Sequence, residues 1–312
     1  MEIPPCPISL STEFSSFLHV SDRFDTTGEK KWNLVRSCKS GLLMLNPRPG
    51  QAEIPFYYRN GRYDPHLTGE DTTCSGEQIY LALHRLLLGY RAGIIIQETQ
   101  KPAHKLSVLE IGCSTGDLLD YLHRKKGIPL QQLAGIEPDT AAAEHARSAF
   151  NLEIHGSIHS GMWEARTFDR IVLWHALEHI HTINETLARI SEMLAPEGRI
   201  VIAVPNADSF DAEHYRENWI AWDAPRHLFH FSPGTLEKLL ERHKLRILAS
   251  RTYFPDTLYN FFFSEKLACS NLKKPFHLFS KAWALFKAGF YGGRSIIHPG
   301  RSSSLVYFAV KT

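Results

Sequence analysis

The chain has 312 residues, a length that suits one large domain or two modest ones. Apolar residues make up 43% of it and charged residues 22%, as in soluble globular proteins, which excludes disordered and fibrous classes. Because 35 Lys and Arg nearly balance 33 Asp and Glu, no broad basic surface for nucleic acid is expected.

The sequence predicts neither membrane insertion nor secretion. It has no run of about 18 apolar residues that would form a spanning helix. Its first residues lack the order of charged, apolar and small residues found in signal peptides. The five cysteines are odd in number and scattered, unlike a disulfide framework. We therefore expect a cytoplasmic protein.

Three zones of the chain differ in their pattern of apolar, polar and turn-forming residues. Residues 1–70 are irregular, with short apolar runs between turn clusters such as NPRPG, and residues 76–98 are helix-like. Residues 106–254 alternate between two kinds of segment. The expected strands are Leu106–Ile111, Leu133–Glu137, Phe168–Trp174, Arg199–Val204 and Arg246–Thr252. The expected helices are Asp117–Lys126, Asp139–Phe150, Thr182–Leu194 and Ser232–Arg242. This alternation predicts a mostly parallel α/β sheet with helices on both faces.

The C-terminal zone mixes aromatic and basic residues over 257–291, before a last expected strand at Ser304–Val310. Phe261, Trp283, Phe286 and Phe290 stand close in sequence to several lysines. One interpretation is a helical insertion packed over a substrate pocket. The other is an interfacial membrane segment that serves a lipid-linked substrate.

The segment Val108–Asp117, VLEIGCSTGD, is a strand that ends in a glycine turn and runs into a helix. Such a turn lies at the carboxyl edge of a parallel sheet, where open α/β folds bind ligands, although a plain connection without a ligand has the same pattern. A dinucleotide site would have glycine where this chain has Ser114 and Asp117.

Three carboxylates indicate which ligand the turn takes. Glu110 and Asp117 would repel a pyrophosphate, and Glu137, at the end of the next strand, suits the two hydroxyls of a ribose. An adenosyl ligand with a cationic sulfonium and an ammonium but no phosphate satisfies all three acids. The sequence therefore predicts S-adenosylmethionine.

Four ordered motifs, VLEIGCSTG, GIEP, FDRIVLWHALEHI and LAPEGRIVIAVPN, resemble those of class I S-adenosylmethionine-dependent methyltransferases. The resemblance covers 106–254 and implies a doubly wound, seven-stranded Rossmann-like sheet. It implies that the cofactor lies among the following residues: Glu110, Gly112, Ser114, Gly116 and Asp117 around the methionine; Glu137 and Pro138 at the ribose; Ser157 and Ile158 near the adenine; and Trp174 with His175 beneath the sulfonium. Ser114 replaces a glycine of the family pattern.

The run from His175 to His179 spells H-x-x-E-H, which is also a zinc peptidase motif when it lies on a helix. Here it directly follows an expected strand, in the place where the methyltransferases carry a similar run. His175 is therefore either a general base that faces the substrate or an architectural contact.

The stretch from Trp219 to Phe231 follows the expected strand Arg199–Val204 and resembles the W-D-x-P-R-H-L segment of a bacterial methyltransferase subgroup, near the substrate. That resemblance makes Trp222, Asp223 and Arg226 candidate substrate contacts, and His227 or His175 a candidate base. The alternative is that Asp223 and Arg226 form a structural ion pair among core aromatics.

Residues 1–70 resemble the zinc-ribbon segment of the same subgroup, but its four ligand positions fall on Cys6, Ser9, Ser37 and Ser40. Serine hydroxyls do not replace thiolates at zinc, so we expect no bound metal, and a module kept in shape by packing with Tyr57 and Tyr58 over the cofactor cleft.

The expected organisation is a degenerate zinc-ribbon-like module over 1–70, a helical linker over 71–105 and a cofactor-binding domain over 106–312. The expected function is methyl transfer from S-adenosylmethionine to an oxygen or nitrogen of a small molecule or of a glycan or lipid-linked precursor. An inactive cofactor-binding scaffold is the alternative, and an NAD-dependent oxidoreductase is disfavoured by Ser114 and Asp117.

Overall fold

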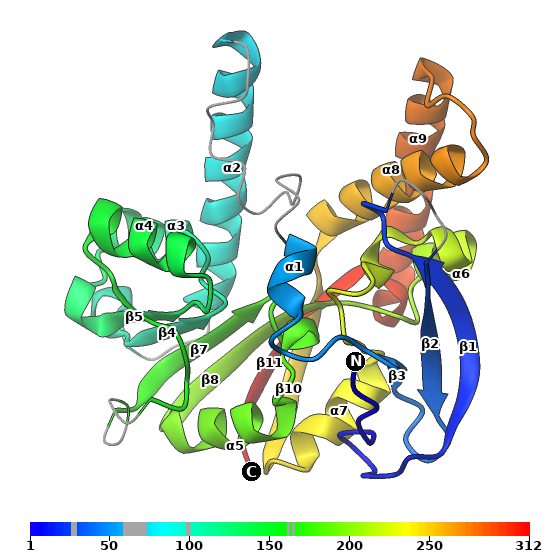
Figure 1. Ribbon diagram of the computed structural model, residues 1–312. Helices are drawn as coiled ribbons and strands as arrows, with labels where there is room; N and C mark the ends of the chain where they lie inside the picture. Colours follow the sequence, from blue (N-terminus) through cyan, green and yellow to red (C-terminus); the bar gives the residue numbers. More distant parts are fainter. Residues whose placement is uncertain (26–29, 59–73, 98–100, 161–162, 164–165) are drawn as a thin grey trace.

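The computed structural model describes residues 1–25, 30–58, 74–97, 101–160, 163 and 166–312. Its largest element is a seven-stranded sheet in the order β10-β11-β8-β7-β4-β5-β6 (Figure 1). The strands are β4 (Val108–Ile111), β5 (Leu133–Ile136), β6 (Glu153–His155), β7 (Phe168–Trp174), β8 (Leu194–Pro205), β10 (Leu245–Thr252) and β11 (Ser304–Lys311). All neighbouring strands pair in parallel except β11, which is antiparallel to β8 and β10. The doubly wound sheet that the sequence predicts is confirmed.

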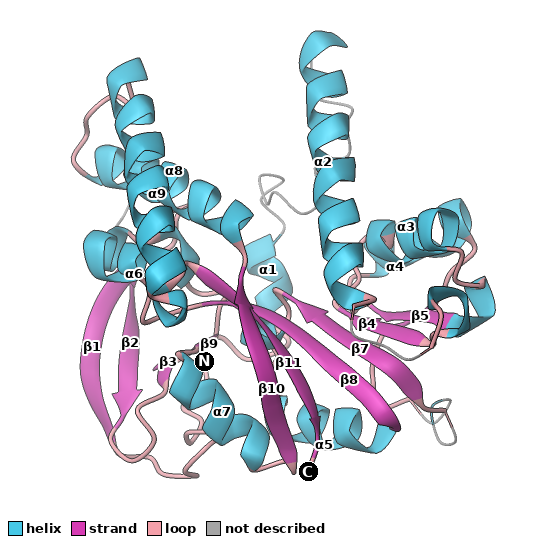
Figure 2. Cartoon of the chain, turned by 180° about the vertical axis from the view of Figure 1, so that it is seen from behind, coloured by secondary structure: helices cyan, strands magenta, loops and turns pink. Residues whose placement is uncertain are grey.

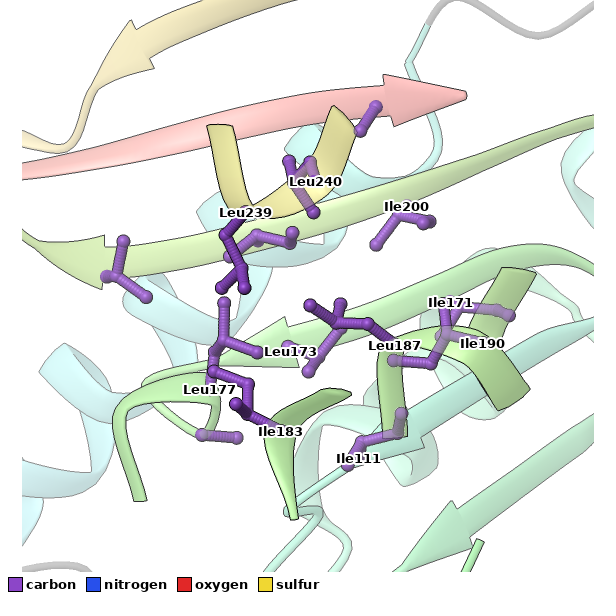
Figure 3. Close-up of a cluster of buried hydrophobic side chains, with 14 of the residues drawn as sticks. Ile111, Ile171, Leu173, Leu177, Ile183, Leu187, Ile190, Ile200, Leu239 and Leu240 are labelled. Atoms are coloured by element: carbon purple, nitrogen blue, oxygen red, sulfur yellow. The ribbon is translucent and has the colours of Figure 1, made fainter. Parts of the chain in front are cut away.

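Helices cover both faces of this sheet, because alternate strand residues point to opposite sides. On one face lie α5 (Ile183–Met193) and α7 (Pro233–Glu241). Figure 3 shows Leu187 and Leu239 from these helices meeting Leu173 and Ile200 from the strands. On the other face lie α2 (Cys74–Ile95), α3 (Asp117–Lys126) and α4 (Thr140–Phe150).

A second, four-stranded sheet is formed mainly by the N-terminal residues. Its strands β1 (Phe14–Ser21), β2 (Lys31–Ser37) and β3 (Leu43–Leu45) are joined by β9 (Phe229–His230), which comes much later in the chain. A short helix, α1 (Ile54–Tyr58), follows. The expected boundary at residue 70 lies outside the described residues, and the N-terminal sheet takes its last strand from well beyond it.

The four ligand positions of the zinc-ribbon pattern lie together beside the turn that joins β2 to β3. The Cys6 Sγ is 3.2 Å from the Ser40 Oγ, and the Ser9 Oγ is 3.4 Å from the Ser37 Oγ. Cys38 is exposed. Hydrogen bonds therefore join these positions pairwise, in addition to the packing that the sequence suggested.

The remaining helices are α6 (Phe210–Tyr215) and, between β10 and β11, α8 (Phe254–Asn271) and α9 (Leu278–Ile297). The insertion expected before the last strand is thus a pair of helices. Figure 2 shows this pair projecting from the body of the molecule, as α2 also does. Among the described residues, no helix is both long and apolar enough to cross a membrane.

A buried ion-pair network fastens the N-terminal sheet to the main domain. The Arg226 Nη2 lies 2.7 Å from both the Asp22 Oδ1 and the Asp223 Oδ1, and the Arg23 Nε lies 3.0 Å from the Asp223 Oδ1. Burial alone would raise the pKa of Asp223, but the two guanidinium groups hold it well below its usual range. Asp22 and Arg23 directly follow β1, so the network ties that strand to the segment before β9.

Replacing Arg226 with Met should lower the free energy of unfolding by about 3–5 kcal/mol, because Asp22 and the buried Asp223 would lose the guanidinium that bridges them, leaving Asp223 with Arg23 alone. Urea denaturation of Arg226→Met measures this. Arg189→Met, which removes an arginine paired with the exposed Glu192, should change stability by only about 0.5 kcal/mol. Equal urea midpoints for the two variants would contradict a fastening role for the network.

Candidate active site

The glycine turn after β4 owes its shape to three residues with positive φ. Gly112 has φ 76°, Ser114 49° and Gly116 83°, and α3 begins at Asp117. At the two glycines, packing also excludes a side chain. A Cβ on Gly112 would lie 2.9 Å from the Ala176 Cβ, and one on Gly116 would lie 2.7 Å from Leu152. The turn therefore packs directly against the segment that follows β7.

Two of the three expected carboxylates lie beside this turn. Glu137 accepts hydrogen bonds at 2.9 Å from the Ser114 N–H and from the Asp139 N–H. Glu110 is buried on β4, its Oε2 has no hydrogen-bond partner within the described parts of the chain, and burial raises its pKa to about 8. An orphaned buried carboxyl oxygen suits a ligand that brings a cationic group, such as the ammonium of S-adenosylmethionine.

The other expected cofactor residues have these positions. Asp117 accepts a hydrogen bond from the Thr115 Oγ1 at 2.6 Å. Pro138 follows Glu137 at the end of β5. Ser157 is exposed, whereas Ile158 is buried in the core. Trp174 is buried at the end of β7, with the Arg91 guanidinium 5.1 Å above its ring. Direct cofactor contact by these residues stays a prediction.

His175 is held between two carboxylates. Its Nδ1 lies 3.3 Å from the Glu178 Oε1 and its Nε2 lies 2.8 Å from the Asp256 Oδ2. Burial alone would lower the pKa of His175, but these carboxylates raise it to about 10. The imidazole is therefore a cation at neutral pH, which suits an architectural contact better than a general base.

The rest of the H-x-x-E-H run forms a 3₁₀ turn, Leu177–His179, and His175 before it has φ 51°. The helix that would place both histidines on one face for a peptidase zinc site is therefore missing from this described segment. Glu178 is fully buried. Its hydrogen bond with His175 and the nearby imidazoles outweigh burial and lower its pKa to about 2.

His227 lies against this turn. Its ring packs edge-on to that of His179 with 4.6 Å between centroids, and its Nδ1 is 2.8 Å from the Ala221 carbonyl oxygen. Burial lowers the pKa of His227 to about 4. Glu178, His179 and His227 each offer one ligand-type atom, and these three atoms lie within 4.8 Å of one another. We call these three residues the histidine–glutamate cluster.

The aromatic and charged residues before His227 have structural contacts. Trp222 is buried, and its Nε1 donates to the Arg216 carbonyl oxygen at 2.6 Å. Asp223 and Arg226 form the buried ion pair described above. This geometry matches the structural alternative for the pair, and a substrate contact by any of the three stays a prediction.

Tyr58 reaches the cluster from α1, as its hydroxyl lies 2.9 Å from the His179 Nδ1. Tyr57 instead contacts Lys30 and Trp32 of the N-terminal sheet. The N-terminal module thus supplies one tyrosine to the site.

Two residues at the site were missed in the sequence. Asp256, on α8, holds His175, and Arg91, on α2, stacks on Trp174 and donates from its Nε to the Tyr253 hydroxyl at 3.3 Å. Neither belongs to a local motif, and only the fold brings them to the end of β7.

Comparisons with known proteins agree with this geometry. Residues 82–250 match a family model described as a methyltransferase domain. The C-methyltransferase NovU of Streptomyces niveus is 27% identical over 173 residues, which are 52% of this chain and 40% of that protein. The chain thus spans less than half the length of this relative.

A similar solved structure is a Haloferax volcanii complex of the Trm112 methyltransferase activator with a putative methyltransferase. It matches 76% of this chain and 94% of that one, at 14% identity and a TM-score of 0.50. This likeness concerns the fold. The matched family model covers more than half of the present chain. The chain therefore belongs to the family of class I S-adenosylmethionine-dependent methyltransferases.

Proposed function

We propose that the chain transfers a methyl group from S-adenosylmethionine to a hydroxyl oxygen of a small molecule or of a glycan or lipid-linked precursor. The observation that carries the proposal is the histidine–glutamate cluster on the turn that packs against Gly112. When bound, the cofactor supplies a methyl group on a positively charged sulfur, and an acceptor hydroxyl must give up its proton as it attacks.

The cluster suits the uptake of that proton. The Glu178 carboxyl is ionised, and the low pKa of His227 leaves its imidazole neutral at every pH above about 5. Because the Nδ1 of His227 faces a carbonyl oxygen, it carries the ring proton, and the Nε2 keeps its lone pair. His227 is therefore the better candidate of the two histidines for a base, and His175 is the positioning residue.

Nitrogen and carbon remain alternative acceptor atoms. A neutral amine attacks with its own lone pair and requires no such cluster. Carbon is the atom in the name of NovU, of which this chain covers 40%. A non-catalytic scaffold would also bind the cofactor, but it would not require ionised and neutral proton acceptors at the cofactor turn. The cluster thus supports an enzyme with a hydroxyl acceptor.

The proposed binding of the cofactor can be tested without an acceptor. Glu137→Ala should weaken the affinity for S-adenosylhomocysteine by about 1–3 kcal/mol, because the ribose hydroxyls would lose a charged hydrogen-bond acceptor. Calorimetry measures this, with Glu144→Ala on the exposed face of α4 as the control. Unchanged affinity in Glu137→Ala would refute the ribose assignment, and a thermal shift with NAD but not with S-adenosylhomocysteine would refute the cofactor.

The test of the acceptor atom requires an assay of methyl transfer. With cofactor labelled with tritium in its methyl group and a cell extract as the acceptor source, the protein should form a product whose label hydroiodic acid releases as methyl iodide, as from a methyl ether. His227→Ala should lower the rate by about 100-fold or more, because the cluster loses a proton acceptor, while affinity for S-adenosylhomocysteine stays within about twofold.

The exposed His145→Ala on α4 should retain the full rate. Label that resists hydroiodic acid would show methylation of carbon or nitrogen and contradict the hydroxyl acceptor. A His227→Ala rate equal to that of the control would contradict the role of the cluster.

We further propose that α8 and α9 contact an anionic membrane surface, which would bring a lipid-linked acceptor to the site. Large side chains on α9 are exposed, with Phe279 at 79% and Phe286 at 61%. The two acids of these helices are paired, Asp256 with His175 and Glu265 with Lys287. Lysines are exposed along the same surface: Lys266, Lys273, Lys274 and Lys281. Apolar side chains among unopposed lysines complement an anionic interface.

Vesicles that contain phosphatidylglycerol should co-sediment the protein, and neutral phosphatidylcholine vesicles should do so weakly, because lysines contribute about 1 kcal/mol each at an anionic surface. The double variant Trp283→Asp and Phe286→Asp should stay in the supernatant, whereas Ile3→Asp, at an exposed apolar residue of the N-terminus, should sediment as the original protein does. No sedimentation of the original protein with anionic vesicles would end the membrane proposal.

A further inference from the structure

The histidine–glutamate cluster has the composition of a metal site. It brings together two imidazoles and one carboxylate, with one ligand atom from each within 4.8 Å of the others. Glu178 has 1% of its surface exposed and His227 has 8%, so water does not solvate these groups freely. His179 is partly buried, so the set as a whole is largely removed from water and costly without a bound cation or a proton network.

The outer contacts of the two histidines fix their orientation. The His227 Nδ1 lies 2.8 Å from the Ala221 carbonyl oxygen, and the His179 Nδ1 lies 3.1 Å from the Arg226 carbonyl oxygen. Because a carbonyl only accepts, each Nδ1 carries the proton and each Nε2 keeps its lone pair, and the Tyr58 hydroxyl, 2.9 Å from the His179 Nδ1, accepts from the same N–H. Metal-binding histidines almost always donate their other ring N–H to a carbonyl or carboxylate in this way.

Glu178 supplies the third ligand without losing its existing contact. Its Oε1 faces His175, whereas its Oε2 is buried and has no hydrogen-bond partner in the described structure. This second oxygen, buried and unpaired beside two imidazoles, is available to a metal ion. His175 itself is not a ligand, because Glu178 and Asp256 occupy both of its nitrogens.

We propose that Glu178, His179 and His227 bind one divalent transition-metal ion, such as Zn²⁺ or Mn²⁺. Two imidazoles and one carboxylate favour such ions over Mg²⁺ and Ca²⁺, which prefer oxygen ligands. Atoms that lie about 2.1 Å from one ion are roughly 3.0–3.5 Å from each other. Side-chain rotations that move each of the three ligand atoms by about 1 Å would bring them into place.

Three protein ligands leave coordination positions open, as in catalytic metal sites. An acceptor hydroxyl on the ion would lose its proton more readily, since a bound cation lowers the pKa of a coordinated oxygen. This catalytic consequence rests on the proposed function, whereas binding of the ion does not. His227 would then act on the acceptor through the ion that it holds.

The test is metal binding by the full chain after removal of metal with a chelator. Titration with Co²⁺, followed by its visible absorption, and competition with Zn²⁺ should give one tight site per chain. Glu178→Gln and His227→Gln should each lower the affinity by tenfold or more. Their affinities for S-adenosylhomocysteine, measured by calorimetry, should stay within about twofold, which shows that they are folded.

Two control variants test whether Co²⁺ binds elsewhere in the chain. Cys6→Ser removes the thiol of the N-terminal module, and His145→Gln removes an exposed histidine of α4. Both should bind Co²⁺ as the original protein does. Binding that is absent from the original protein, retained in Glu178→Gln or lost in Cys6→Ser would overturn the proposal. Methyl transfer by a protein that binds no Co²⁺ in this titration would overturn the metal site and leave the proposed function standing.

Discussion

The close contact between Gly112 and Ala176 is the constraint on which the site depends. A Cβ at Gly112 would come within 2.9 Å of Ala176, so only glycine lets the turn after β4 pack against the turn after β7. The carboxylates expected to receive the cofactor lie beside the first turn, and the second turn carries Glu178 and His179. The parallel order of β4 and β7 puts both turns at the same edge of the sheet.

The N-terminal module contributes to the same edge, although serine occupies three of the four zinc-ligand positions in the pattern that it resembles. Arg226 joins Asp22, just after β1, to the segment that carries His227, and Tyr58 on α1 reaches His179. Loss of this module would remove these contacts and leave β9 without its partner strand β3. The module therefore helps to fix the position of the histidine–glutamate cluster.

Much of the fold was predictable because local patterns determine it. Apolar runs and helical spacing predicted α3 over Asp117–Lys126 and β7 over Phe168–Trp174 with the bounds that the structure has. The three-residue β6 and the two-residue β9 were missed, because strands so short leave no periodicity. The roles of the histidines also escaped prediction. The charge on His175 depends on Asp256, which is distant in sequence, and the neutrality of His227 depends on its burial. The prediction of no metal was based on the cysteine pattern and on the H-x-x-E-H run taken separately. The proposed site combines two residues of that run with His227, which is distant in sequence.

The most direct test of the account is a crystal structure with S-adenosylhomocysteine bound. The account predicts the ribose hydroxyls on Glu137, the ammonium toward Glu110, and the sulfur turned toward Glu178, His179 and His227. A ligand bound away from the Gly112 turn, or one whose sulfur faces away from these three side chains, would contradict the claim that the two turns form one methyl-transfer site.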